Sequence, residues 1–520
     1  MNNKYISYFK IATLSVAISL SACKKTLQID PQDSISADQA LTSKDGIDAT
    51  IVSIYSSLKA EVFYGNRLVM LGDALSDNAR STNHSGRYVS EAANARLASY
   101  SHWSAAYVNL NRINLVLEAL PNASSLSAAQ KDAYTGELKF LRALYHFDLV
   151  KTYAYIPGAL VESQNRGGIP LALKAISSSS DALQLQSARN SIAEVYTAIY
   201  ADLDEAVSKL SNITSSTVVR ANKQAAQALY SRVALYNKDY PKAISNASSV
   251  LEVRANTLLN ANNYIAGWSQ AVNPESVFEI AFLAANETLG VNLALQTNLT
   301  TLSARATNKS RDSTDKYKAG LPLKPGSGFG DLVPTSDLLT ALGITVANNG
   351  AAATSLGAAA TTITNRSADV RNLLYEVGSS SRTPIYVECT KYLGKSGFAN
   401  VDNVPVIRVS EMYLNRAEAY ANASQESLAL ADVNTIRVAR GLPAVTGLTG
   451  SALINEILLQ RRLEFAFEGQ RFLDLKRLGR DILKPVTNTT IAFTDIVILP
   501  QIPVTDVNAS GGKLLQNFGY

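Results

Sequence analysis

Apolar residues recur every three or four positions along much of the chain, a spacing that places them on one face of an α-helix. Ile47, Ile51, Ile54 and Leu58 show the pattern clearly. The segments with this spacing in the first half of the chain are residues 42–63, 103–121, 136–156, 191–210, 221–238 and 240–252. We therefore predict a series of amphipathic helices there.

Two of these segments also begin with a residue pair typical of a helix start. Ser191 with Glu194, and Thr42 with Asp45, have the spacing at which a hydroxyl and a carboxylate cap a helix N-terminus. Asp239-Tyr240-Pro241 separates two helical segments, because proline is tolerated only at a helix start. The pattern predicts helices bounded at these positions.

The helices are expected to form hairpins. Tyr240, Ala243 and Val250 follow the turn at spacings like those of the second helix of a tetratricopeptide unit, in which small residues allow close packing. A second helical hairpin is predicted between residues 410 and 440, with an alanine-rich first helix. Stacked pairs of this kind bury a continuous core.

The middle of the chain has a different composition. Residues 283–316 contain no aromatic residue, and residues 335–385 are rich in Ala, Thr, Ser, Asn and Gly. Core-like residues bracket both, including Trp268 and the run "VFEIAF". We predict a mostly α fold, with tetratricopeptide-like hairpins over residues 42–282 and 401–520. A loop-rich lobe with a few short strands is expected over residues 283–400.

The first residues have the features of an export signal. Two lysines precede a 12-residue apolar run, residues 11–22, which Cys23 follows directly, and no acidic residue appears before Asp30. A helix of that length covers roughly 18 Å, too short for a hydrocarbon core of about 30 Å. We expect residues 1–22 to be removed, Cys23 to be acylated, and residues 23–41 to form a tether. An ordinary signal peptide is the alternative.

Composition excludes several classes of function. Removal of two lysines with the signal lowers the formal charge from +5 to +3, too small a surplus for nucleic-acid binding. Only Cys389 then remains, so an intramolecular disulfide is excluded. The three histidines are scattered, and the chain has no phosphate-binding glycine loop and no Gly-x-Ser-x-Gly elbow. We predict no metal, no cofactor and no catalytic residue.

Several blocks identify a family by resemblance. They are "FLRALYHFDLVKTY", "GGIPL", "AAQALYSRVALYNKDYPKAI", "NVPVIRVSEMYLNRAEAYANA", "LINEILLQRRLEFAFEGQRFLDLKRLGR" and the terminal "LLQNFGY". In this order, after a lipobox, they resemble the SusD/RagB family of Bacteroidetes outer-membrane lipoproteins. Phe518 departs from the family ending, which has proline there.

The resemblance implies a non-catalytic binding protein. It implies a lipoprotein at the cell surface, anchored in the outer membrane, that captures oligosaccharide or another nutrient. The partner implied is a SusC-like TonB-dependent transporter, to which the ligand is passed.

Sugar capture needs aromatic rings and groups that form hydrogen bonds with hydroxyls. The stretch "FYGNRLVMLGDALSDNARSTNHSGRY" supplies both, and a polar connection without a binding role is the alternative. Trp103 fits either a ligand platform or the core, and Trp268 fits either the site or the lobe interface. Phe329, between glycines, is expected to form an exposed platform. The candidate residues are Tyr64, Arg67, Asp73, Asp77, Asn78, Arg80, Tyr88, Trp103, Trp268 and Phe329.

Glu464 and Glu468 lie four residues apart, on one face of a predicted helix, as two catalytic carboxylates might. Four arginines lie close in sequence and favour a structural ion network instead. Nearby guanidinium groups would keep both carboxylates ionised, whereas a general acid needs a raised pKa. The alternatives to glycan binding are a tetratricopeptide-like adaptor for protein partners and a lipid-anchored glycosidase.

Overall fold

The computed structural model describes residues 41–178, 181, 188–212, 217–282, 285–304, 323–350, 361–393 and 400–520. The predicted signal peptide, Cys23 and the tether up to residue 40 lie outside these ranges. Within them, none of the helices combines the length and apolarity that spanning a bilayer requires.

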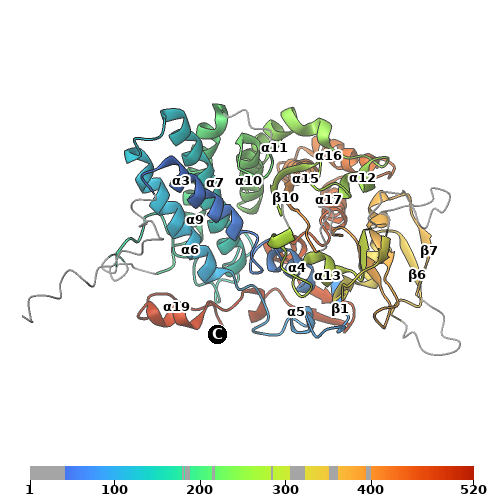
Figure 1. Cartoon of the computed structure of the whole chain (residues 1–520). Coiled ribbons are helices and arrows are strands. Elements are labelled where there is room, and N and C mark those ends of the chain that lie inside the picture. The colour runs from blue at the N-terminus through green and yellow to red at the C-terminus, as the bar shows by residue number, and fades with distance from the viewer. Residues whose placement is uncertain are drawn as a thin grey trace, which may run out of the picture.

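Long helices extend from the left of the view in Figure 1 across its upper part to the right of centre, and we call them the helical array. They are α3 (Lys44–Ser57), α6 (Trp103–Ala119), α7 (Ala128–Tyr153), α9 (Ile192–Lys209), α10 (Lys223–Tyr236), α11 (Tyr240–Arg254), α15 (Val409–Asn422), α16 (Glu426–Ala439) and α17 (Gly450–Glu464). The predicted mostly α fold is confirmed.

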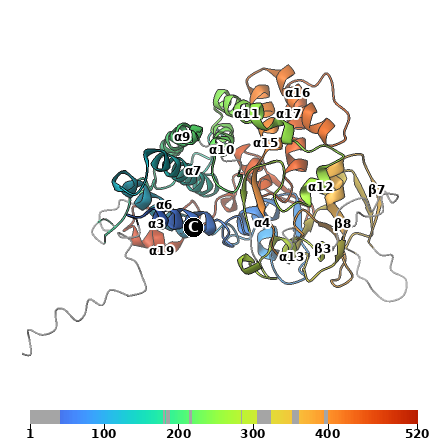
Figure 2. The same ribbon diagram turned by 45° about the horizontal axis from the view of Figure 1, so that its top comes forward.

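The two predicted hairpins are α10 with α11 and α15 with α16. Although more than 150 residues separate them in sequence, α11 packs directly against α15. Figure 2 shows the array running from α6 and α9 through α10 and α11 to α16 and α17. The N-terminal and C-terminal segments therefore share one helical layer.

Local sequence explains where these helices begin. Ser191 and Glu194 form the predicted capping box of α9. For α3 the cap is Ser43, whose hydroxyl accepts a hydrogen bond from the backbone N–H of Gly46. The expected cap at Thr42 is therefore wrong by one residue. The helix α11 begins at Tyr240, with Pro241 in its first turn as predicted.

Short helices lie outside the array. They are α4 (Arg67–Ala74), α5 (Val89–Ala92), α12 (Tyr264–Trp268), α13 (Leu295–Leu299), α14 (Ser336–Ala341), α18 (Arg471–Arg477) and α19 (Val504–Ala509). Single 3-10 turns lie at η1 (Leu120–Asn122), η2 (Leu210–Asn212), η3 (Ala255–Thr257), η4 (Ala285–Glu287), η5 (Val370–Leu374) and η6 (Ile496–Ile498).

The described strands form antiparallel pairs, several of which join distant segments. These are β1 (Ala79–Ser81) with β5 (Leu332–Pro334), β2 (Ser276–Ile280) with β10 (Val404–Arg408), β3 (Leu302–Ala304) with β4 (Leu323–Pro325), β6 (Ile344–Ala347) with β7 (Thr362–Arg366), β8 (Tyr375–Val377) with β9 (Val387–Cys389), and β11 (Ile482–Lys484) with β12 (Thr489–Ile491). The pairing of β1 with β5 ties the N-terminal segment after α4 to the predicted loop-rich lobe.

Candidate functional site

Two polar loops that are far apart in sequence meet where β1 pairs with β5. The register sets Ser81 opposite Leu332. Just beyond it, Thr82 donates from its backbone N–H to the carbonyl of Asp331 (2.9 Å) and from its hydroxyl to the carbonyl of Gly330 (2.9 Å). These bonds hold the loop at residues 82–88 against Phe329.

Phe329 lies half-buried at the surface with arginines on its ring. The guanidinium carbon of Arg87 lies 4.7 Å from the ring centroid, and that of Arg382 lies 4.5 Å from it. Next to them, Arg80 lies over the ring of Tyr386 at 5.1 Å, and His84 lies 6.0 Å from the same ring. We call these six residues, Arg80, His84, Arg87, Phe329, Arg382 and Tyr386, the Phe329 patch.

Hydrogen bonds fix the patch from two sides. His84 Nδ1 lies 2.7 Å from the carbonyl oxygen of Phe329, and Nε2 lies 2.9 Å from that of Pro384. Because both oxygens are acceptors, the ring donates to both only when it carries two protons. His84 therefore links the loop of Phe329 to the segment that carries Arg382.

A buried carboxylate lies directly beneath the Phe329 loop. Glu388 accepts hydrogen bonds from the hydroxyl of Thr300 (2.8 Å) and the backbone N–H of Thr301 (2.7 Å). It forms no ion pair with a described residue, and burial raises its pKa to about 7. A Cβ at Gly330, whose φ is +57°, would lie 2.6 Å from Glu388 Oε1. Glycine is therefore needed for the loop to pass over this carboxylate.

A groove lies beside the patch. Its volume is about 480 Å³, within the range of small-molecule sites. It is lined by Ser336, Leu339, Thr340, Gly343, Ile344, Thr345, Val346, Asn349, Asn365 and Ser367, from α14, β6, β7 and the residues that follow them. Asn349 accepts from the backbone N–H of Val387, next to Tyr386, so this end of the groove adjoins the patch. We call it the polar groove.

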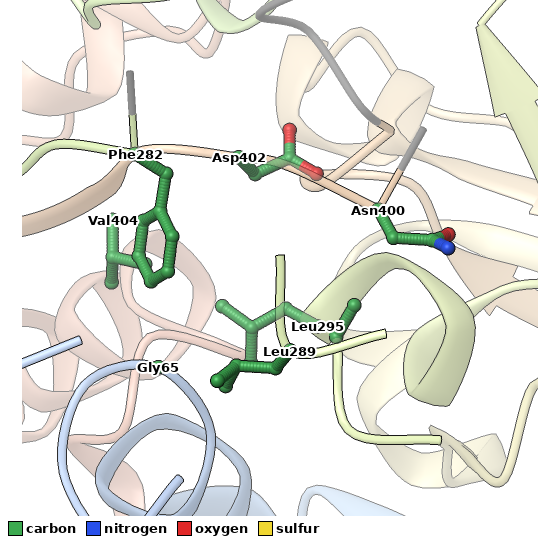
Figure 3. Close-up of a pocket in the computed structure, with 8 residues that line it drawn as sticks. Gly65, Phe282, Leu289, Leu295, Asn400, Asp402 and Val404 are labelled. Carbon is green, nitrogen blue, oxygen red and sulfur yellow. The ribbon is translucent and has the colours of Figure 1, made fainter. Parts of the chain in front are cut away.

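A second cavity is far smaller. Figure 3 shows its lining, in which apolar side chains such as Phe282 and Leu295 face Asn400 and Asp402. Its volume of about 10 Å³ is enough for a single water molecule and excludes a sugar ring.

Most of the other aromatic candidates are packed inside the molecule. Trp103 is 2 % exposed and contacts Tyr107 and Tyr153, and Trp268 is fully buried against Tyr264 and Tyr392. The structure favours the core alternative for Trp103 and the interface alternative for Trp268, because neither ring face is open to a ligand.

The two tyrosine candidates are also buried. The hydroxyl of Tyr64 donates to the carboxylate of Asp148 (2.9 Å). That of Tyr88 contacts the side-chain oxygens of Asn66 (2.8 Å) and Asn298 (2.9 Å). Direct ligand contact by either tyrosine stays a prediction, and the structure gives each an internal partner instead.

The polar candidates are likewise occupied by neighbouring side chains. Arg67 pairs with Glu91 (2.9 Å) and Asp77 with Arg471 (2.8 Å). Buried Asn78 donates to Asp73 (2.9 Å), and burial raises the pKa of Asp73 to about 6. Ligand contact by these residues also stays a prediction. Arg80 and Phe329 are the candidates that the structure brings together at the surface.

Glu464 is the last residue of α17 and Glu468 lies beyond its end, so the expectation that both lie on one helix face is wrong. Both belong to an ion network. Glu464 lies 2.8 Å from Arg440, 2.9 Å from Arg408 and 3.6 Å from Arg371. These cations hold the pKa of Glu464 well below its usual range, although burial opposes them. The buried arginine network, as we call it, consists of Glu275, Arg371, Lys391, Arg408, Arg440, Glu464 and Glu468. This environment favours the structural alternative for both glutamates.

The remaining chemistry-bearing residues are enclosed. Burial lowers the pKa of both His102 and His146 to about 4, and it raises that of the Cys389 thiol to about 12. Among the described residues, no group of three or more His, Cys, Asp or Glu side chains is placed to hold a metal ion.

Sequence reasoning missed four members of the patch: His84, Arg87, Arg382 and Tyr386. His84 and Arg87 lie inside the polar stretch that we identified as a candidate binding loop, and its glycine and charged residues could have indicated them. Arg382 and Tyr386 lie more than 50 residues from Phe329 in sequence. Their place depends on the tertiary pairing of loops, for which the sequence has no local signal.

Comparison with known proteins identifies the family. A family model described as "Starch-binding associating with outer membrane" matches residues 27–235, and one described as "SusD family" matches residues 382–520. The chain is similar to the SusD-like protein P38 of Formosa agariphila, with 23 % identity covering 94 % of both proteins.

Solved structures share the fold. A SusD superfamily protein from Bacteroides thetaiotaomicron matches with a TM-score of 0.72 and 21 % identity, over 91 % of this chain and 99 % of that one. A structure titled laminarin-binding SusD-like protein matches with a TM-score of 0.63 and 20 % identity, over 92 % of this chain and all of that one. With two family models that together match more than half of its length, the chain belongs to the SusD/RagB family.

Proposed function

We propose that the protein binds oligosaccharide or polysaccharide outside the cell and delivers it, unaltered, to a SusC-like TonB-dependent transporter. The observation that carries this proposal is the Phe329 patch beside the polar groove. Arg87 and Arg382 already lie over the Phe329 ring, so the ring offers a sugar apolar contact only at its remaining exposed surface. The guanidinium, hydroxyl and amide groups around it can exchange hydrogen bonds with the sugar hydroxyls.

Two comparisons support a sugar as the ligand. The N-terminal family model is described as starch-binding, and one structural neighbour is titled as binding laminarin. The paired state of Glu464 supports a non-catalytic role, because a carboxylate kept ionised cannot act as the general acid of glycoside cleavage.

The proposed location follows from the family and the first residues. The matched model is described as associating with the outer membrane. We propose that Cys23 carries the lipid anchor, because two or more acyl chains hold a protein stably on a membrane. Replacement of Cys23 by serine should abolish palmitate labelling, and the anchored protein should co-purify with the transporter.

The direct test is affinity electrophoresis of the mature chain on a panel of plant, algal, microbial and host polysaccharides. At least one should retard it. Phe329→Ala should weaken that retardation about tenfold or more, because it removes both the apolar contact and the ring on which Arg87 and Arg382 rest. The matched control is Phe518→Ala, since Phe518 is 41 % exposed and lies under Arg166.

Two results would contradict the proposal. No retardation by any polysaccharide, with transporter binding retained, would favour the adaptor alternative. Release of smaller sugars from a retarding polysaccharide, lost on Glu464→Gln, would favour the glycosidase alternative.

A further inference from the structure

Two arginines of the Phe329 patch differ from other arginines of the molecule, because they contact aromatic rings and form no ion pair with a described carboxylate. Arg142, Arg232 and Arg477 each form ion pairs, with Asp202, Glu411 and Glu418. Arg80 and Arg382 contact the rings of Tyr386 and Phe329, and neither forms an ion pair with a described residue. In addition, the Nε of Arg80 is buried without a hydrogen-bond partner in the described part of the chain.

Arg87 is only partly neutralised. Its Nη1 lies 3.4 Å from Asp331 Oδ2, while its Nη2 donates to Asn292 (2.5 Å). The other oxygen of Asp331 accepts from the hydroxyl of Ser85 (2.5 Å), and burial raises the pKa of this carboxyl. Among the described residues, the patch thus sets three guanidinium groups against one ion-paired carboxylate.

Contact with the rings leaves these guanidinium groups suited to bind an anion. A guanidinium is planar and carries its N–H donors in that plane, where they match the two oxygens of a carboxylate or sulfate. The ring also holds the side chain in place, which reduces the entropy that binding costs. A neutral sugar needs hydrogen-bond partners, but it does not need a cluster of cations that outnumber their carboxylate partners.

We propose that the ligand is an anionic saccharide, whose carboxylate or sulfate groups bind Arg80, Arg87 and Arg382. This inference rests on the proposed function and names the class of glycan. The polar groove complements it, because its described lining residues supply hydroxyl and amide groups and include no charged side chain. The anionic sugar unit lies on the patch, and uncharged hydroxyls of neighbouring units lie along the groove.

The test uses polysaccharide pairs that share a backbone and differ in charge. Polygalacturonate and its methyl-esterified form probe the carboxylate. Sulfated and unsulfated laminarin, and dextran sulfate and dextran, probe the sulfate. Calorimetric titration of the mature chain should give an affinity about tenfold or more higher for the charged member of at least one pair, as charge-assisted hydrogen bonds imply.

Variants distinguish binding of the anion by the patch arginines from non-specific attraction of the anion to a basic protein. Arg382→Gln and Arg80→Gln should each reduce the preference for the charged member while retaining affinity for the neutral one. The matched control is Arg480→Gln, since Arg480 is exposed and its polar partner is Asn455 (3.5 Å). An equal loss in the control would show attraction by net charge only and would overturn the proposal.

The remaining outcomes distinguish the two proposals. Equal affinity for charged and neutral members overturns the anionic class and leaves glycan binding intact. A preference for the charged member that survives both patch variants overturns the assignment of these arginines. Failure of every polysaccharide to bind overturns the proposed function and this inference together.

Discussion

The buried arginine network and the Phe329 patch use the same side chain in opposite ways. In the network, Arg408 and Arg440 lie over the rings of Trp268 and Tyr264, and both also pair with Glu275 and Glu464. The patch arginines also lie over aromatic rings, but among the described residues Asp331 is the one carboxylate that forms an ion pair with them. Arginines therefore contact aromatic rings in both regions. The two regions differ in the number of carboxylates that pair with those arginines.

The difference follows from burial. Arg371, Arg408 and Arg440 are at most 2 % exposed, so each needs a carboxylate to offset the loss of water. The network also joins segments far apart in sequence, since Glu275 lies before the loop-rich lobe and Glu464 after it. The patch arginines remain half-exposed, and water can solvate their charge until a ligand replaces it.

Breaking the network should have the largest effect on stability. Glu464→Gln leaves Arg440 and Arg408 with one buried carboxylate fewer, and we expect the free energy of unfolding to fall by about 3–5 kcal/mol. Chemical denaturation at pH 7 measures it. The control Glu252→Gln, at an exposed position of α11, should change stability by about 0.5 kcal/mol or less. Equal stability of the two variants would contradict a structural role for the network.

Glu388 should produce a smaller, pH-dependent effect. Because burial raises its pKa from 4.5 to about 7, the folded protein binds a proton that the unfolded chain releases between these values. Its contribution to stability is complete below pH 4.5 and is lost as the pH rises through 7.

Glu388→Gln should remove this loss. Above pH 7 the free energy of unfolding of the variant should exceed that of the wild type by up to about 3 kcal/mol. Below pH 4.5 the two free energies of unfolding should not differ for this reason. Denaturation midpoints across pH 4–8 measure the difference. A constant difference between the two proteins over that range would contradict the assignment.

The smallest effect on stability is expected at the patch. Arg382→Gln removes a half-exposed contact with Phe329, for which we expect about 1 kcal/mol or less of stability. Its thermal midpoint should therefore stay close to that of the wild type while affinity for charged glycan falls. A loss of stability comparable to that of Glu464→Gln would place Arg382 with the structural arginines and remove the contrast.

The helical array and the buried arginine network could be predicted from the sequence to different extents. The helical array could be read from apolar spacing and helix caps, because these signals lie within one helix. Ion pairing of Glu464 could be expected from its sequence, but its partners could not, because Arg371, Arg408 and Arg440 all lie outside the block that carries it. The four arginines close to it in sequence pair with other carboxylates instead, namely Asp474, Asp337, Asp77 and Glu418. The prediction of the helices depends on local sequence pattern. The prediction of ion pairing depends on the general cost of burying charge.

The patch could be predicted only in part. Glycines around Phe329 indicated an exposed loop, and the structure places that ring at the surface. The roles of the two tryptophans were harder to predict, because helical spacing is the same for a core residue and for a residue that stacks on a ligand. Arg382 reaches Phe329 only through loop contacts such as that of His84 with Pro384, which no periodic pattern encodes.

The most direct test of glycan binding at the Phe329 patch is a crystal structure of the mature chain with an oligosaccharide from its tightest-binding polysaccharide. We predict a sugar ring within about 4 Å of the Phe329 side chain, with a carboxylate or sulfate held by Arg382 or Arg80. An ordered oligosaccharide bound elsewhere, with the patch empty, would contradict the account.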